Sequence, residues 1–162
     1  MKFSIKRGLP RTNVRGQSLF EVILAIAVLT LILGGLVSLA TVSVRNSTFS
    51  RNKTLSSKYA QEASEWLRSE RDNDINLFSL KANSAFDTPK YYCLDALAWT
   101  KQVACSPTEF IAGTPFIRNL TLTKTVKSEK TVIETDVVVS WQDSQGIHEA
   151  RSFTYLSDWR ER

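Results

Sequence analysis

The sequence is poor in the residues that enzymes and metal sites use most often. It holds one histidine and two cysteines among 162 residues. It contains no glycine-rich phosphate loop and no pair of histidines, and a single histidine leaves few ways to pair a nucleophile with a base. Two cysteines do not make a zinc site, and His148 lies far along the chain from both of them. We therefore expect no enzymatic activity, no metal and no cofactor.

Acidic residues are absent from the first part of the chain, and charge of either sign is absent from the next. Residues 1–16 hold no acid and five basic residues, and Val22–Val44 contains no charged residue and no proline. As an α-helix, this run of 23 residues rises about 34 Å, against about 30 Å of bilayer hydrocarbon. The run therefore predicts a single membrane span. The five basic residues are Lys2, Lys6, Arg7, Arg11 and Arg15.

The apolar run begins in an unusual way for a secretory signal. Such a signal has an apolar core of about 7–15 residues and a small-residue cleavage site after the core. Here the small residue, Gly16, precedes the run, and a carboxylate follows it at Glu21. A charge at membrane depth costs free energy unless it finds a partner, so Glu21 is a candidate functional residue.

These residues resemble the type IV prepilin signal, which pilins share with the pseudopilins of type II secretion and of competence. In that family a membrane peptidase cleaves on the cytoplasmic side after a glycine, and the fifth residue of the mature chain is glutamate. Cleavage after Gly16 would make Gln17 the first residue and Glu21 the fifth. The resemblance implies that Gly16 and Gln17 form the cleavage site and that Leu19, Phe20 and Glu21 serve assembly.

The first residue after the cleavage site departs from the family's usual pattern. The principal subunits begin with phenylalanine, whereas this chain has Gln17. The departure favours a minor pilin and weakens the expectation of amino-terminal methylation. Residues 59–73 also resemble pilV-type minor pilins, although a solvated helix face with paired charges explains the same residues.

The resemblance implies a location and a set of partners. The leader is expected in the cytoplasm, with one span in the inner membrane and the globular domain outside, and the subunit is expected in an extracellular filament after assembly. The partners are other pilin-like subunits, the prepilin peptidase and the inner-membrane assembly platform. Removing the five basic residues of the leader leaves 16 basic against 16 acidic residues, so the charge does not indicate nucleic-acid binding.

Three alternatives to a pilus subunit stay open at this stage. The same signal fits a pseudopilin of type II secretion or competence. A single-span membrane-anchored ectodomain for binding or sensing would make Glu21 incidental. Conventional secretion is the third, because Ser38-Leu-Ala40 is an acceptable signal-peptidase site and would give a mature chain that begins at Thr41.

The rest of the chain predicts an α+β fold. Apolar residues recur at helical spacing after the membrane run, at Leu55, Tyr59, Ala63, Trp66 and Leu67, which predicts one helix from about Gln17 to about Asn73. The resemblance implies that its second half packs on an antiparallel sheet, as in the pilin fold. We divide the chain into a leader (1–16), a transmembrane and assembly half (17–44), an exposed helix half (45–74), an irregular region (75–118), a β-meander (119–156) and a tail (157–162).

The irregular region holds both cysteines and several aromatic residues. After translocation the domain lies in an oxidising compartment, so Cys93 and Cys105 are expected to form a disulfide. The aromatic residues either fill gaps beneath the region or form an exposed binding surface, and core filling is the favoured interpretation. They are Tyr91, Tyr92, Trp99 and Phe110.

Downstream the apolar period changes to two, which predicts antiparallel strands. Turns are expected at Lys127–Lys130 and Asp143–Gly146, followed by a last strand from about Ile147 to Tyr155. Phe153 and Tyr155 are expected to face the core. The other inward residues are expected at Leu120, Leu122, Val126, Ile133, Val137, Val139 and Trp141.

Overall fold

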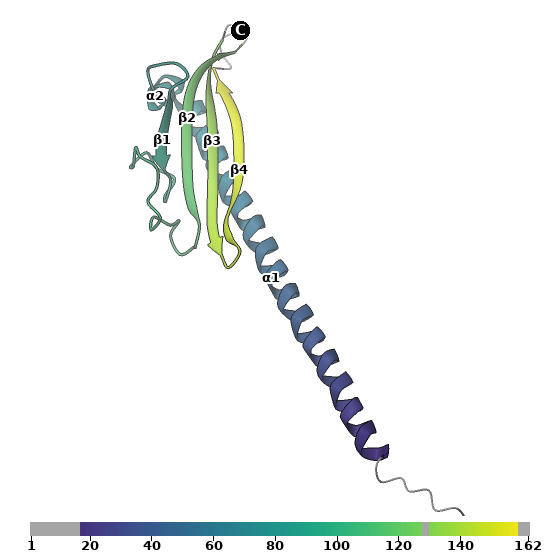
Figure 1. Cartoon of the computed structure of the whole chain (residues 1–162). Coiled ribbons are helices and arrows are strands. Elements are labelled where there is room, and N and C mark those ends of the chain that lie inside the picture. The colour runs from purple at the N-terminus through teal and green to yellow at the C-terminus, as the bar shows by residue number, and fades with distance from the viewer. Residues whose placement is uncertain (1–16, 128–129, 159–162) are drawn as a thin grey trace, which may run out of the picture. The chain divides into compact units, whose positions relative to one another are not determined.

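The computed structural model describes residues 17–127 and 130–158. Within these ranges two helices precede and flank one antiparallel sheet (Figure 1). The predicted leader, with Gly16, lies outside the described residues, and so does the end of the predicted tail. The elements are α1 (Gln17–Asn73), α2 (Ile75–Lys81), β1 (Pro89–Cys93), β2 (Ile117–Lys127), β3 (Lys130–Asp143) and β4 (Gly146–Ser157).

Helix α1 has the bounds that the sequence predicts. It contributes to two units, one up to Ser47 and one from Thr48 onward. The helix is long and apolar enough, by length and composition, to cross a membrane. In the second unit, the part of α1 after Thr48 packs on the sheet.

The sheet has four antiparallel strands in the order β1-β2-β3-β4. Strands β2, β3 and β4 form the predicted meander, and their turns join Lys127 to Lys130 and Asp143 to Gly146. Gly146 has φ 124°, a backbone conformation that residues with a Cβ rarely adopt. The predicted turn at Asp143–Gly146 is therefore confirmed, whereas residues 128 and 129 of the other predicted turn lie outside the described residues.

Residues 75–118, predicted to be an irregular region, contain the short strand β1. It pairs with β2 along the edge of the sheet, with Tyr91 opposite Thr121 and Cys93 opposite Asn119. Pro89 begins the strand, which an edge position tolerates because proline has no N–H to donate. The same region contains α2, whose start is capped by Asp74, because the Asp74 carboxylate accepts from the N–H groups of the two residues after Ile75.

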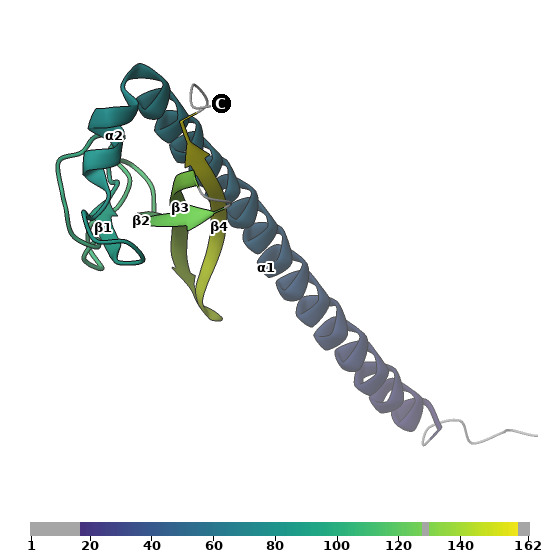
Figure 2. The same cartoon turned by 90° about the horizontal axis from the view of Figure 1, so that it is seen from above.

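The core lies between the part of α1 after Thr48 and one face of the sheet, and this part of the helix runs beside the sheet in both views (Figures 1 and 2). The predicted apolar stripe forms the helix side of this core: Ala63 and Leu67 are fully buried, and their neighbours pack against them. Alanine at the contact lets the helix approach the strands closely. The arrangement is α+β and consistent with the expected pilin-like fold. Fully buried strand residues facing α1 include Leu120, Leu122, Val137 and Val139.

Strand β4 buries the face opposite to the one that the sequence predicts to be buried. Phe153 and Tyr155 are 53% and 46% exposed and lie against one another outside the core, with ring centroids 4.9 Å apart. Their register explains this: they pair with Asp136 and Glu134, which are on the outer face of β3. The prediction that they face the core is wrong.

The inner face of β4 is formed instead by Ala150, Leu156 and the polar residues between them. Ser152 belongs to this face, and its hydroxyl accepts a 2.7 Å hydrogen bond from the hydroxyl of Ser64 on α1. This polar pair lies where α1 packs on the sheet. The inner face of β4 is therefore not uniformly apolar, and the alternation of apolar and polar residues that predicts strands is interrupted there. Val126 also differs from expectation: it is exposed, because the core residues of β2 end at Leu122.

Candidate functional site

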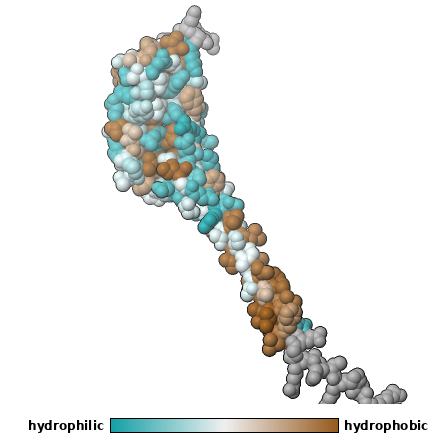
Figure 3. All heavy atoms as spheres, in the orientation of Figure 1, coloured by the Kyte–Doolittle hydropathy of each residue, from teal (hydrophilic) through white to brown (hydrophobic). Residues whose placement is uncertain are grey.

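The first candidate site is the part of α1 from Leu19 to Val44, which we name the assembly segment. Its large apolar side chains are all exposed within the described structure, and Leu19 and Phe20 are 65% and 70% exposed. Figure 3 shows brown, hydrophobic atoms gathered along this part of the helix, with paler atoms between them. An exposed apolar surface of this kind is stable in lipid or against other helices, not in water.

The backbone of the assembly segment is satisfied internally, as a membrane helix requires. The hydroxyls of Thr30 and Thr41 donate to the carbonyls of Ala27 and Val37 at 2.8 and 2.9 Å. Neither hydroxyl is therefore left unpaired in an apolar environment.

Glu21 is the only charged side chain of the assembly segment. It lies in the second turn of α1, four residues after Gln17, and is exposed. In a helix, this separation corresponds to about 6 Å along the axis. The carboxylate is therefore placed near the amino-terminal end of the helix, where the macrodipole favours negative charge.

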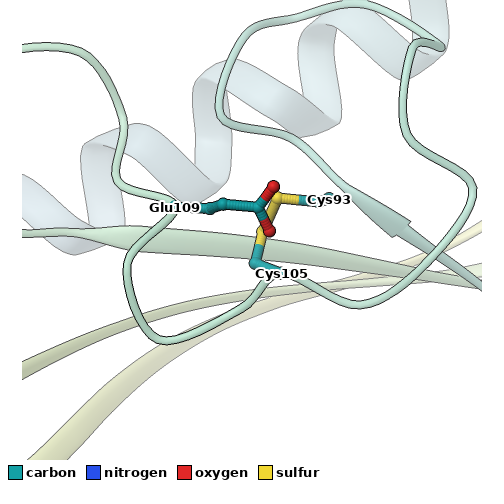
Figure 4. Close-up of side chains that lie close together, drawn as sticks. All are labelled: Cys93, Cys105 and Glu109. Atoms are coloured by element: carbon teal, nitrogen blue, oxygen red, sulfur yellow. A yellow bond between two sulfur atoms is a disulfide. The ribbon is translucent and has the colours of Figure 1, made fainter.

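The second candidate site is the loop closed by the disulfide between Cys93 and Cys105, which confirms the predicted pairing. Figure 4 shows the Glu109 carboxylate beside the two sulfur atoms. The three side chains lie within metal-ligand spacing, with their candidate ligand atoms all within 4.8 Å of one another. Metal ligation by cysteine needs a thiolate, however, and these sulfurs are bonded to each other.

Both oxygens of Glu109 already have partners. Oε1 lies 2.8 Å from Nζ of Lys101, and Oε2 accepts a 2.6 Å hydrogen bond from the N–H of Ser106. Lys101 also binds Asp95 at 2.7 Å, so one ammonium joins two carboxylates across the loop. The arrangement holds the loop in shape and accounts for Glu109 without a metal ion.

The Lys101 ammonium shifts the pKa values of the two carboxyls that it binds. Hydrogen bonding to Lys101 lowers the pKa of both Asp95 and Glu109 below their ordinary values. The two carboxylates in turn raise the pKa of Lys101. All three groups are thus held charged over a wider pH range than they would be alone.

The four aromatic residues of the predicted irregular region divide between the two roles considered. Tyr92 is buried, and Trp99 packs against it and against Trp66, with ring centroids 5.1 and 4.7 Å away. Tyr91 and Phe110 are exposed. Core filling is therefore confirmed for one pair and wrong for the other, and Trp99 gains a further partner because its indole N–H donates to Glu70 at 2.6 Å.

His148 lies on β4 with its Nε2 atom 2.9 Å from Oδ1 of Asp143. Its ring also packs against Phe49 and Trp141, at centroid distances of 5.1 and 5.3 Å. Among the described hydrogen bonds, Asp143 is its one side-chain partner. The position is that of a half-buried residue at the end of the sheet, held between an acid and two aromatic rings.

No pattern in the sequence predicts one ion pair inside the domain. Arg118 on β2 is buried and lies 3.3 Å from the carboxylate of Glu62 on α1. On α1 itself, Arg68 binds Glu65 and Arg71 binds Asp72. Arg118 is buried because β2 packs against α1, and no local sequence pattern predicts that contact.

None of the protein-family models, curated proteins or solved structures compared with this chain matches it.

Proposed function

We propose that this chain is a minor structural subunit of a bacterial type IV pilus, cleaved after Gly16 by a prepilin peptidase and assembled through the assembly segment. The observation that carries the proposal is the exposed apolar surface of this segment with Glu21 as its one charge. An α+β domain with its own core accompanies the segment in the same chain. The large apolar side chains of the assembly segment are all exposed within the described structure. Such a segment needs lipid before assembly and neighbouring helices after it.

The proposed chemistry of assembly is charge pairing in an apolar environment. Cleavage after Gly16 creates an ammonium at Gln17, and Glu21 is an acceptor for the ammonium of a neighbouring subunit. An unpaired charge in hydrocarbon is costly, so the pair gives both attraction and a fixed stagger between helices. Leu19 and Phe20, beside Glu21, supply apolar contact at the same level of the helix.

The proposed partners follow from this role. They are other pilin-like subunits, the prepilin peptidase and the assembly platform of the inner membrane. Before assembly the chain would cross the membrane once, with the leader in the cytoplasm and the sheet domain outside. Gln17 in the first mature position favours a minor subunit over the principal one.

Sequencing the amino terminus of the mature chain tests the proposal. We expect a start at Gln17 in cells that hold the peptidase and an intact leader in cells that lack it. A Gly16→Val variant is the matched control, because it should block cleavage and leave the membrane segment unchanged. A start at Thr41 would indicate ordinary secretion, and an intact leader in both cell types would indicate an anchored ectodomain; either result would overturn the proposal.

Purified filaments provide the second measurement. A minor pilus subunit should appear in type IV pili at trace amounts relative to the principal subunit. Recovery of the processed chain only in a secretion or competence pseudopilus would replace the pilus assignment with that of a pseudopilin.

A further inference from the structure

A pocket of about 480 Å³ lies where the end of α2 meets the β1 edge of the sheet. We name it the lysine pocket. Helix α2 lies beside β1 in both views (Figures 1 and 2), and residues of α2, β1 and β2 line the pocket. Its volume is within the range of small-molecule sites. Its polar lining residues are Ser79, Asn83, Ser84, Lys90, Gln102 and Lys124.

The register of the sheet places the two lysines of the pocket together. Lys90 on β1 pairs with Leu122 on β2, and Lys124 lies two residues further along β2. Residues that pair, and residues two apart on a strand, share one face of a sheet. Both lysines are therefore on the face that carries the buried Leu122, at its margin, and both are half-buried.

Neither lysine has a carboxylate partner among the described ion pairs. Their recorded contacts are with aromatic rings: Nζ of Lys90 lies 5.8 Å from the Tyr92 ring centroid, and Nζ of Lys124 lies 5.3 Å from that of Phe86. Asp87 is near in the fold, but its contact with Lys124 is a backbone hydrogen bond from its N–H to the lysine carbonyl. The lysine pocket thus holds two ammonium groups that take part in none of the described ion pairs.

The other polar groups of the pocket are also free to bind a ligand. The side chains of Ser79, Ser84 and Gln102 make no hydrogen bond within the part of the chain that the structure describes. Asn83 uses its carbonyl oxygen to accept from the N–H of Ala85, which leaves its amide N–H groups as donors. Two ammonium groups, two hydroxyls and two amides therefore line one hollow, and no acid is among its lining residues.

We propose that the lysine pocket binds a sugar that carries an oxyanion, either a sugar phosphate or an acidic sugar. The two ammonium groups would bind the phosphate or carboxylate as point charges. The serine hydroxyls and the amides of Asn83 and Gln102 both donate and accept, as the hydroxyls of a sugar ring require. A simple inorganic anion would use the lysines and leave these neutral groups unused.

The test titrates the full-length chain in a neutral detergent with glucose 6-phosphate, glucuronate and glucose, and follows binding by calorimetry. We expect both charged sugars, or one of them, to bind in the low millimolar range or tighter, and glucose to bind more weakly. The preferred charged sugar then identifies whether phosphate or carboxylate is the oxyanion.

The decisive comparison uses two double variants that remove the same charge. Lys90→Ala with Lys124→Ala should lower the affinity for the charged sugar by about tenfold or more, which corresponds to losing a charge-assisted contact. Arg51→Ala with Lys58→Ala is the control, because both side chains are exposed on α1 and have no ion pair among the described residues. This control should bind as the unchanged chain does.

A third double variant, Ser79→Ala with Ser84→Ala, tests the neutral part of the site. We expect it to weaken the charged sugar and to leave inorganic phosphate unchanged. Thermal unfolding of every variant verifies that the domain is still folded. Three results would overturn the proposal: no binding of either charged sugar, an equal loss in the two charge-removing variants, or binding of inorganic phosphate as tight as that of the charged sugars.

Discussion

Nη1 of Arg118 lies 3.3 Å from Oε2 of Glu62, and the pair joins strand β2 to helix α1. The two partners differ in environment, because the Arg118 side chain is 3% exposed and that of Glu62 is 52% exposed. Arg118 also donates from Nε to the Leu94 carbonyl at 2.9 Å and from Nη1 to the Tyr59 carbonyl at 3.3 Å. Burial lowers the pKa of Arg118, and the nearby carboxylate opposes that shift.

This asymmetry predicts unequal effects of removing the two partners. Arg118→Ala should lower the free energy of unfolding by about 3 kcal/mol, because the buried Leu94 carbonyl and the half-buried Tyr59 carbonyl lose a donor and a cavity forms. Glu62→Gln should cost about 1 kcal/mol or less, since water reaches the Glu62 side of the pair. Denaturant unfolding of the full chain in neutral detergent, followed by tryptophan fluorescence, measures both values. Glu65→Gln, in an exposed pair with Arg68, is the control; equal losses for the Arg118 and Glu62 variants would contradict the prediction.

The register of β4 makes a second prediction. Leu156 is buried against the core, whereas Phe153 is on the outer face. Leu156→Ala should therefore cost about 2–3 kcal/mol, and Phe153→Ala about 1 kcal/mol or less. The same unfolding experiment compares the two. A larger loss for Phe153→Ala would mean that the strand is shifted by one residue.

The disulfide makes a third prediction. Its cysteines are 12 residues apart, so in the chain-entropy model its loss should cost about 3 kcal/mol. Replacing Cys93 and Cys105 together by serine should lower stability by that amount, and adding a reductant to the unchanged chain should have the same effect. The reductant should do nothing further to the double variant. An unchanged midpoint after verified reduction would show that the loop is held by Lys101 and its carboxylates alone.

The pH dependence of stability is a fourth prediction, and it comes from Asp95 and Glu109. Lys101 lowers the pKa of both carboxyls in the folded chain. Between the folded and unfolded pKa values the unfolded chain binds more protons, so their contribution is present above the ordinary values of 3.8 and 4.5 and is lost as the pH falls.

Lys101→Met should remove this contribution. Its unfolding midpoint should fall less steeply with decreasing pH than that of the unchanged chain, from about pH 6 to about pH 3. Lys58→Met is the matched control, because Lys58 is exposed and has no recorded carboxylate contact. Parallel pH profiles for the Lys101 variant and the unchanged chain would show that the three groups do not couple to folding.

The fifth prediction concerns Glu21 and rests on the proposed function. Glu21→Ala should still be cleaved after Gly16 but should enter filaments about tenfold less, because the ammonium of a neighbouring subunit loses its partner in hydrocarbon. Immunoblots of purified filaments and of membranes measure the two steps separately. Glu65→Ala, which removes an exposed acid from the part of α1 after Thr48, should enter filaments normally. Normal entry of the Glu21 variant would remove the proposed role of charge pairing.

Several features of the fold could be predicted because they depend on neighbours in sequence. The apolar run and the stripe through Ala63 and Leu67 repeat at helical spacing, and α1 has the predicted bounds. The alternation around Val137 and Val139 predicted β3, and Gly146 marked its turn. The cysteine pair was predictable because only one pairing is possible.

Other features depended on partners far along the chain and could not be predicted. Strand β1 has too few residues to show a period, and it forms because β2 offers it an edge. The lysine pocket needs α2, β1 and β2 together. The same limit applied to Arg118, which carries a charge on a strand face and is buried only because Glu62 and two carbonyls on other segments receive it.

The sequence by itself determined the local periods: a helix with an apolar surface suited to lipid, a carboxylate near its start, and strands that alternate. Side-chain spacing along one segment is sufficient for those features, because helices and strands present their faces at fixed intervals. The tertiary structure decided which face of β4 is buried and which charges are paired. Those outcomes depend on strand register and on contacts between distant segments, such as that of Ser64 with Ser152, which are 88 residues apart, and no local pattern contains that information.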